Sequence, residues 1–268
     1  MSDAPPTVLT VAGSDPSGGA GLQADLKTIH QHGAYGAAVP TLITVQNTSG
    51  VEDVELLSPD LVRAQLACLL EDLEPAAAKT GALGSPAVAH VVGSVMEESP
   101  FPWVVDPVWL PTRGRPLSKG DVVKAYKDAV IPRAALVTPN AQEAALLVEM
   151  PVRSLEDAKT AAERIAALGA RAVLVKGGHL EGSALGTDLL LHDGVVTELA
   201  AAEIVPGRFH GTGCALSAAI ATRLAFGEDI PTAVAQAKAW LTDALRHGFA
   251  IGKGGVPVNH LWDVDGKS

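Results

Sequence analysis

Residues 7–32 read TVLTVAGSDPSGGAGLQADLKTIHQH, and the order of residue types in this stretch decides the fold class. Residues 7–13 are a short, β-branched apolar run that ends in glycine, which is typical of a buried strand feeding a loop. A glycine-rich loop, SDPSGGAG, follows. Leu22, Leu26 and Ile29 then recur at helical spacing. The stretch therefore predicts a strand, a loop and a helix.

The alternation of strand and helix patterns continues along the chain. Short apolar runs are separated by Ala/Leu-rich segments, which is typical of βαβ units around a parallel sheet. We therefore expect an α/β fold, with residues 1–268 forming one domain. The expected strands are 36–46, 51–57, 76–83, 102–108, 134–138 and 171–176, with a hairpin turn at 192–194. The expected helices start at Pro59 (with Leu61, Leu66 and Leu69 facing inward) and Pro86, and cover about 213–226 and 231–247.

The composition excludes several classes of protein. With 268 residues, 47% apolar and 19% charged, the chain can bury a large core, which excludes a mostly disordered protein. A formal net charge of −10 without a Lys/Arg cluster argues against a nucleic-acid partner. No apolar run approaches the roughly 18 residues of a membrane span, and MSDAPP lacks the features of a signal peptide. We therefore expect a soluble protein without a membrane partner.

The chain has two cysteines, Cys68 and Cys214. Their number and spacing indicate neither a zinc site nor a disulfide framework, so we expect a reducing, cytoplasmic setting. Cys68 falls within the apolar pattern LVRAQLACLL, which predicts a small buried side chain.

Polar motifs directly follow several of the expected strands. In an open parallel sheet, ligands bind beyond the carboxyl ends of the strands, so motifs in these positions are expected to line one rim. The motifs are AGSDPSGGAG, Lys79-Thr80-Gly81, Asp106-Pro107, Thr138-Pro139-Asn140 and Lys176-Gly177-Gly178-His179.

The segment HGTGC, residues 210–214, opens an expected helix. Free N–H groups and the helix dipole favour an anion at such a terminus, and Gly211 and Gly213 allow the main chain to approach it closely. Together with Thr212 they predict a phosphate site, although a glycine-rich turn into a helix is the plain alternative. The dipole lowers a thiol pKa, so Cys214 is a candidate general base with a thiolate available near neutral pH. The alternative is a small buried hydrophobe.

Two carboxylates and a lysine at the same rim are candidates to complete the predicted phosphate site. Asp106 and Glu143 offer hard oxygen ligands for Mg²⁺. Lys176 is placed to reach nucleotide phosphates as a point charge. Helix capping by Asn140 and surface positions for Glu143 and Lys176 are the alternatives.

Asp15, Asp25, Gln46 and Asn47 surround the first loop and the end of the second strand. Amides and carboxylates recognise planar heterocycles through paired donors and acceptors, although Asn and Asp also simply form turns. A dinucleotide fingerprint is weak here and G-x-x-x-x-G-K-[ST] is absent, which argues against an NAD enzyme and a P-loop ATPase.

Seven segments occur in register: AGSDPSGGAGLQADLKT, TVQNTSGV, AAKTGAL, VVDPV, VTPNAQEAALL, VLVKGGHL and HGTGCALSAAIA. Together they resemble the hydroxymethylpyrimidine/phosphomethylpyrimidine kinases of thiamin biosynthesis, a branch of the ribokinase-like superfamily. The resemblance implies a three-layer α/β/α fold, a homodimer, and ATP- and Mg²⁺-dependent phosphorylation of 4-amino-5-hydroxymethyl-2-methylpyrimidine and then of its monophosphate.

The resemblance also implies roles for individual residues. Cys214 resembles the base, and the amides of Gly211, Thr212 and Gly213 resemble the anion hole. The remaining matches are Gly13, Asp25, Gln46 and Val108 on the substrate side, Asp106, Asn140 and Lys176 on the nucleotide side, and Asp106 and Glu143 around Mg²⁺.

Two segments depart from the family pattern. Trp109-Leu110-Pro111-Thr112-Arg113-Gly114 replaces the usual Met-Val-Ala-Lys-Ser-Gly flap, so Trp109 is expected to add bulk at the pocket, with Arg113 as a substitute charge. Arg208-Phe209 replaces an Asn-Thr pair before His210. A pyridoxal kinase of the same superfamily and a ligand-binding relative without catalysis are the alternative functions.

Overall fold

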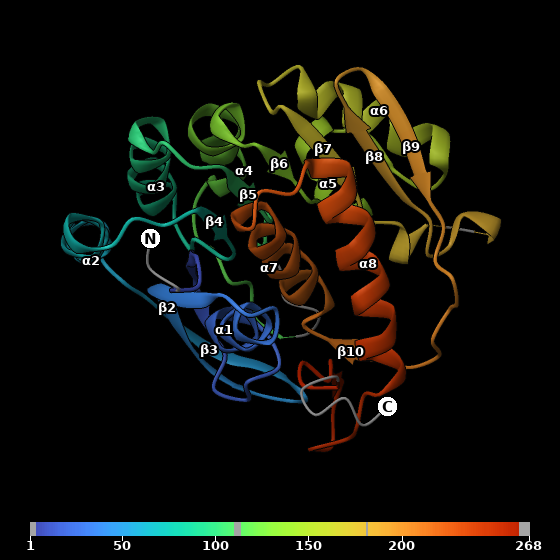
Figure 1. Ribbon diagram of the computed structural model, residues 1–268, viewed down its shortest axis with the longest axis horizontal. Coiled ribbons are helices and arrows are strands. Elements are labelled where there is room, and N and C mark those ends of the chain that lie inside the picture. The colour runs from blue at the N-terminus through green and yellow to red at the C-terminus, as the bar shows by residue number, and fades with distance from the viewer. Residues whose placement is uncertain (1–3, 110–113, 181, 263–268) are drawn as a thin grey trace.

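A computed structural model describes residues 4–109, 114–180 and 182–262 (Figure 1). Its main sheet has nine strands in this part of the chain, in the order β3-β2-β1-β4-β5-β6-β7-β8-β9. The strands from β2 to β7 in this order run parallel, whereas β3, β8 and β9 pair antiparallel at the two edges. The bounds are β1 Thr7–Ser14, β2 Tyr35–Asn47, β3 Gly50–Leu56, β4 Ala77–Thr80, β5 Trp103–Val105, β6 Leu136–Val137, β7 Ala172–Val175, β8 Asp188–His192 and β9 Val195–Leu199.

Helices cover both faces of the sheet, which gives the three-layer α/β/α fold that was predicted (Figure 1). One layer contains α2 (Pro59–Asp72), α3 (Pro86–Glu98), α4 (Val122–Ala125), α5 (Ala141–Val148) and α6 (Leu155–Ala166). The other contains α1 (Gly21–Gln31), α7 (Thr212–Ala225) and α8 (Ile230–Arg246), which lie together in the centre of Figure 1.

Alternate residues of the central strands face the two helical layers. In β7, Val173 and Val175 belong to one core, while Ala172 and Leu174 belong to the other. All four side chains are fully buried, as expected for a parallel strand covered on both faces.

Local sequence signals explain where several elements begin and turn. Ser58 and Ser85 cap α2 and α3 by accepting hydrogen bonds from the backbone N–H groups of Leu61 and Val88, and proline follows each cap. The turn between β8 and β9 places Asp193 and Gly194 at positive φ, which confirms the predicted hairpin.

Two predictions for α2 are wrong. Leu61 is 48% exposed and Cys68 is exposed, whereas Val62 and Leu66 are fully buried. Leu61 and Cys68 are seven residues apart and therefore share one side of the helix. That side points away from the sheet, because the helix buries the stripe that contains Val62, Leu66 and the partly buried Leu69.

The C-terminal part of the described chain returns to the start of α7. Strand β10 (Phe209–His210) pairs parallel with β11 (Val256–Pro257). Just before β11, the Gly255 N–H donates to the Thr48 carbonyl (2.8 Å), so this segment also holds the turn between β2 and β3. Among the helices described, none is long and apolar enough to cross a membrane.

Candidate active site

A cavity of about 800 Å³ opens at the carboxyl ends of the parallel strands. This is where the strand-end rule placed the ligand site. The resemblance assigned roles to twelve residues, and eleven of them line the cavity: Gly13, Gln46, Asp106, Val108, Asn140, Glu143, Lys176, Gly211, Thr212, Gly213 and Cys214.

The start of α7 forms one wall of the cavity. Gly211 is the N-cap residue of α7 and has a φ of 81°. A Cβ at this position would lie 1.7 Å from the Gly19 carbonyl oxygen. Only glycine fits this close approach. No side chain among the described residues caps α7, so its first N–H groups are free to bind an anion.

Lys176 lies beside this helix terminus and between two carboxylates. Its Nζ donates to Asp106 Oδ1 (2.8 Å) and lies 4.0 Å from Glu143 Oε2. A Cβ on Gly213 would lie 3.0 Å from the same Nζ. Burial opposes the charge, but Asp106 and Glu143 outweigh it and raise the pKa of Lys176. The ammonium therefore stays charged where the helix favours phosphate.

Asp106 is fixed deep in the site and Glu143 is held by a helix cap. Thr138 Oγ1 and Ser217 Oγ donate to the two oxygens of Asp106 (3.2 and 3.4 Å). The Asn140 N–H donates to Glu143 Oε2 (2.7 Å), and Asn140 Oδ1 accepts from the Glu143 N–H (2.9 Å). Asn140 thus caps α5, as the alternative interpretation of this residue predicted. It also lines the cavity. Burial raises the pKa of Glu143 to about 7, although Lys176 opposes the shift.

These carboxylates fit one kind of magnesium site. No group of three His, Cys, Asp or Glu suited to a metal occurs among the described residues. Asp106 and Glu143 fit a site in which phosphate oxygens and water complete the coordination of Mg²⁺.

The structure contradicts the expected state of the Cys214 thiol. Burial raises its pKa to about 12; Lys79 favours the thiolate, whereas Asp25 and Asp106 disfavour it. Burial is the largest of these influences and outweighs those that favour the thiolate. Cys214 therefore carries its proton near neutral pH in this structure.

A hydrogen-bonded group not predicted from the sequence lies near Gln46. The ring Nε2 of His210 lies 2.9 Å from Asp15 Oδ2 and 3.2 Å from the Gln46 side-chain nitrogen. Backbone N–H groups of Ser17 and Ala20 also donate to the Asp15 carboxylate. Burial opposes ionisation of Asp15, but hydrogen bonds from His210 and Ser17 hold its pKa below its ordinary value. Asp15 and His210 are far apart in the sequence, so no local pattern links them.

Asp25 does not lie where the sequence placed it. Its side chain is fully buried and bonded to Thr10 and Lys79, and it is absent from the cavity wall. The first turns of α1 direct it under the floor of the site, so the expected direct contact with substrate is wrong in this structure.

Trp109 also points elsewhere. It is 2% exposed and packs edge-on against Tyr126, with ring centroids 5.4 Å apart. The indole therefore fills the core instead of narrowing the pocket, and its neighbour Val108 lines the cavity. Residues 110–113, including Arg113, lie outside the described residues.

A further wall of the cavity is formed by side chains that no sequence motif predicted. Its apolar side chains are Leu185, Ile204, Leu241 and Leu245. Beside them, Lys238 donates to Asp188 Oδ2 (2.6 Å), and the Gly177 N–H donates to Asp188 Oδ1 (2.7 Å). These residues come from loops, β8 and α8, so only folding brings them together.

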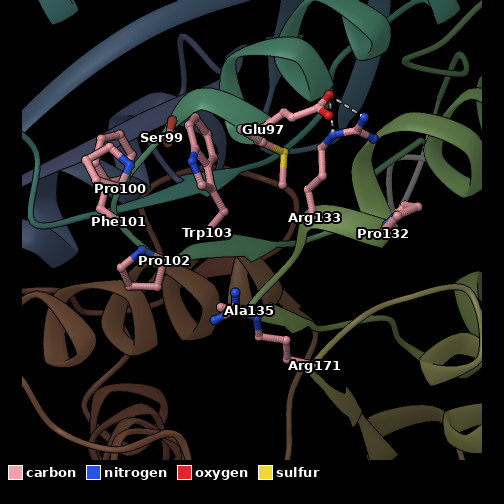
Figure 2. Close-up of a pocket in the computed structure, with 11 residues that line it drawn as sticks. Glu97, Ser99, Pro100, Phe101, Pro102, Trp103, Pro132, Arg133, Ala135 and Arg171 are labelled. Carbon is pink, nitrogen blue, oxygen red and sulfur yellow. Dashed lines mark hydrogen bonds and ion pairs between the residues drawn. The ribbon is translucent and has the colours of Figure 1, made fainter.

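A separate hollow of about 580 Å³ lies at the opposite end of the sheet. Figure 2 shows Phe101, Pro102 and Trp103 on one side of it and the Glu97–Arg133 ion pair on the other. It opens near the amino end of β5, whereas Asp106 follows the carboxyl end of the same strand. The hollow contains none of the residues proposed for catalysis.

A three-layer α/β/α fold with a helix terminus, a lysine and carboxylates at one strand-end cavity defines a phosphotransferase for small molecules. The family model described as "Phosphomethylpyrimidine kinase" matches residues 15–259. A hydroxymethylpyrimidine/phosphomethylpyrimidine kinase of Streptomyces coelicolor is 40% identical over 258 residues, which cover 96% of this chain and 95% of that protein. The chain therefore belongs to the phosphomethylpyrimidine kinase family.

Solved structures agree with this assignment. A phosphomethylpyrimidine kinase from Clostridium difficile is 36% identical with a TM-score of 0.78, covering 90% of this chain and 99% of that one. A pyridoxal kinase from Staphylococcus aureus, in complex with AMP-PCP and pyridoxal, is 35% identical with a TM-score of 0.85, covering 96% and 94%. The comparisons confirm the family and the fold that the seven sequence segments indicated.

Proposed function

We propose that this enzyme transfers the γ-phosphoryl group of ATP to 4-amino-5-hydroxymethyl-2-methylpyrimidine, and then phosphorylates the monophosphate, as a step of thiamin biosynthesis. The observation that carries the proposal is the position of Lys176 against Gly213 at the uncapped start of α7, with Cys214 one residue further along. A helix terminus suited to phosphate, a fixed cation and the thiol that we propose as the proton acceptor thus share one wall. The names of the relatives supply the substrate class.

The phosphates of ATP would bind at the first N–H groups of α7 and at Lys176. The helix terminus and the ammonium both carry positive charge that stabilises the transferring phosphoryl group. Asp106 and Glu143 would hold Mg²⁺, which would offset the negative charge of the phosphates when bound. The apolar wall at Leu185, Ile204 and Leu241 suits the adenine ring.

Cys214 would accept the proton of the substrate hydroxyl. Because its pKa is about 12, only a small fraction is thiolate near neutral pH, and this fraction grows as the pH rises.

The pyrimidine ring would bind near Gln46, Gly13 and Val108. The Gln46 amide offers a donor and an acceptor to a planar heterocycle, and the Asp15–His210 pair holds a second polar group beside it. The rim therefore presents paired polar groups to the ring.

Pyridoxal is the second candidate substrate. The S. aureus pyridoxal kinase has a higher TM-score to this chain than the C. difficile phosphomethylpyrimidine kinase, 0.85 against 0.78. Pyridoxal is also a planar heterocycle with a hydroxymethyl group, so the same wall would serve it.

We also propose that the enzyme acts in the cytoplasm as a homodimer. Both cysteines are free thiols, in keeping with a reducing setting. Tyr35, Ile43 and Val45 are each more than half exposed on β2, an apolar strip that a second copy would cover. Sedimentation velocity of the purified protein tests the dimer.

The test of function compares kcat/KM for ATP-dependent turnover of hydroxymethylpyrimidine, its monophosphate and pyridoxal under one set of conditions. We expect the two pyrimidines to exceed pyridoxal. A higher value for pyridoxal would favour the second candidate, and ligand binding without ATP consumption would assign the protein as a non-catalytic relative.

A further inference from the structure

The hollow at the amino end of β5 spans the starts of three neighbouring strands (Figure 2). Trp103 begins β5, Ala135 precedes β6 and Arg171 precedes β7. The Ala135 N–H donates to the Trp103 carbonyl (3.0 Å), and the Arg171 N–H donates to the Ala134 carbonyl (3.1 Å). The walls are therefore fixed to the sheet, and a volume of about 580 Å³ is ample for a small molecule.

One wall of the hollow carries a guanidinium that is held in place. Arg133 Nη2 and Nε donate to Glu97 Oε2 (2.6 and 3.2 Å), and Nη1 donates to the Ala129 carbonyl (2.9 Å). Glu97 is the only carboxylate among the described residues that line the hollow, and this ion pair offsets its charge. The three bonds use three of the five N–H donors of a guanidinium, so two remain for a ligand.

Arg171 brings a second guanidinium to the hollow. Its side chain is exposed and forms no hydrogen bond or ion pair with any residue that the structure describes. It therefore adds one uncompensated positive charge here, although the chain as a whole has a formal net charge of −10. Local positive charge favours an anion, and arginine donates paired N–H groups to phosphate oxygens.

The wall opposite the ion pair is aromatic. The rings of Phe101 and Trp103 have centroids 5.8 Å apart and planes tilted by 31°. Trp103 is 1% exposed, whereas Phe101 is only partly buried, so Phe101 carries the ring surface that a ligand can reach. Pro100 and Pro102 flank this ring and lose little freedom when a ligand binds. Such a wall suits a planar ring.

We propose that the hollow is a second binding site, and that its ligand is a small aromatic phosphate, a planar ring that carries a phosphate monoester. The ring would pack against Phe101, and the phosphate would bind the free guanidinium of Arg171 and the remaining donors of Arg133. Three phosphate oxygens provide enough acceptors for both arginines. No residue of the hollow lines the strand-end cavity, so this assignment does not depend on the proposed kinase function.

The test is a titration of 5-fluorotryptophan-labelled protein with phenyl phosphate, followed by fluorine NMR. The chain has four tryptophans, Trp103, Trp109, Trp240 and Trp262. The Trp103 signal is identified as the one that Trp103→Phe removes. Trp109 follows Val108 at the strand-end cavity, so a ligand bound at that site should move the Trp109 signal instead.

We expect phenyl phosphate to shift the Trp103 signal in a saturable way, with a Kd of about 1 mM for a ligand of this size. Arg171→Met should weaken this binding by at least about tenfold, because a hydrogen bond to a charged group is lost. Arg63→Met is the matched control, since Arg63 is also exposed but lies in α2, outside the hollow, and its affinity should equal that of the parent. Lys176→Met, which alters only the strand-end cavity, should also keep the parent affinity.

Inorganic phosphate and phenol, the two halves of the probe, should each bind more weakly than phenyl phosphate. A Trp103 signal that stays in place up to about 20 mM phenyl phosphate would overturn the proposal. Equal affinity for phenol, or full affinity in a folded Arg171→Met variant, would also overturn it, because the hollow would then not select an anion.

Discussion

Lys176 donates a 2.8 Å hydrogen bond to Asp106, although the two residues are 70 positions apart in the chain. Lys176 follows β7 and Asp106 follows β5, and the intervening strand β6 sets the distance between them. The pair lies against the start of α7, so a phosphate bound there would meet an ammonium already held in position.

Replacing Lys176 with Met should raise KM for ATP and lower kcat, because the site loses its fixed cation and leaves Asp106 and Glu143 facing each other. We expect a loss of at least about 100-fold in kcat/KM, corresponding to nearly 3 kcal/mol. Steady-state kinetics with varied ATP measures it. Lys127→Met, which removes a lysine from a pair with exposed Glu149, should behave as the parent does.

Replacing Cys214 with Ala should lower kcat by about 100-fold or more, the usual loss for a general base, while pyrimidine binding remains nearly intact. Because the pKa of the thiol is about 12, kcat of the parent enzyme should rise with pH from neutral to alkaline conditions. The variant should lose this rise. Isothermal titration and a pH–rate profile test both parts, and an unchanged kcat would remove Cys214 from the chemistry.

Glu143 should make stability depend on pH. Its folded pKa of about 7 lies above its ordinary value of 4.5, so the folded state binds the proton more tightly than the unfolded state does. Its contribution to stability is fully present below pH 4.5 and is lost as the pH rises to 7. The loss is up to about 3 kcal/mol at 1.36 kcal/mol per pKa unit.

Urea unfolding from pH 4.5 to 8 in EDTA, for the parent and Glu143→Gln, isolates this effect. The free energy of unfolding of the parent should fall relative to the variant up to about pH 7 and then run parallel. A constant difference over this range would show that Glu143 has an ordinary pKa. In kinetic assays, Glu143→Gln should also need more Mg²⁺ for half-maximal activity.

Gly211→Ala should destabilise the protein and weaken phosphate binding. The new Cβ would lie 1.7 Å from the Gly19 carbonyl oxygen, at a φ of 81° that side chains rarely adopt. We expect a loss of at least about 2 kcal/mol in the free energy of unfolding. Gly178→Ala is the control for stability, since a Cβ there would meet no atom within 4 Å. Equal stability of both variants would contradict the steric argument.

The sequence by itself determined the local elements and the edge of the sheet at which the cavity opens. Serine followed by proline started α2 and α3, an Asp-Gly turn closed β8 and β9, and polar motifs after strands marked the rim. These features depend on residues a few positions apart, so local propensity and periodicity are sufficient to predict them.

Only the tertiary structure decided where individual side chains point and which distant residues meet. Asp25 and Trp109 stand in segments that match or replace family motifs, yet one lies beneath the floor and the other in the core. The contact of His210 with Asp15 and the high pKa of Cys214 depend on burial and on charges from several strands and helices. Such effects depend on distance in space, which sequence spacing does not determine.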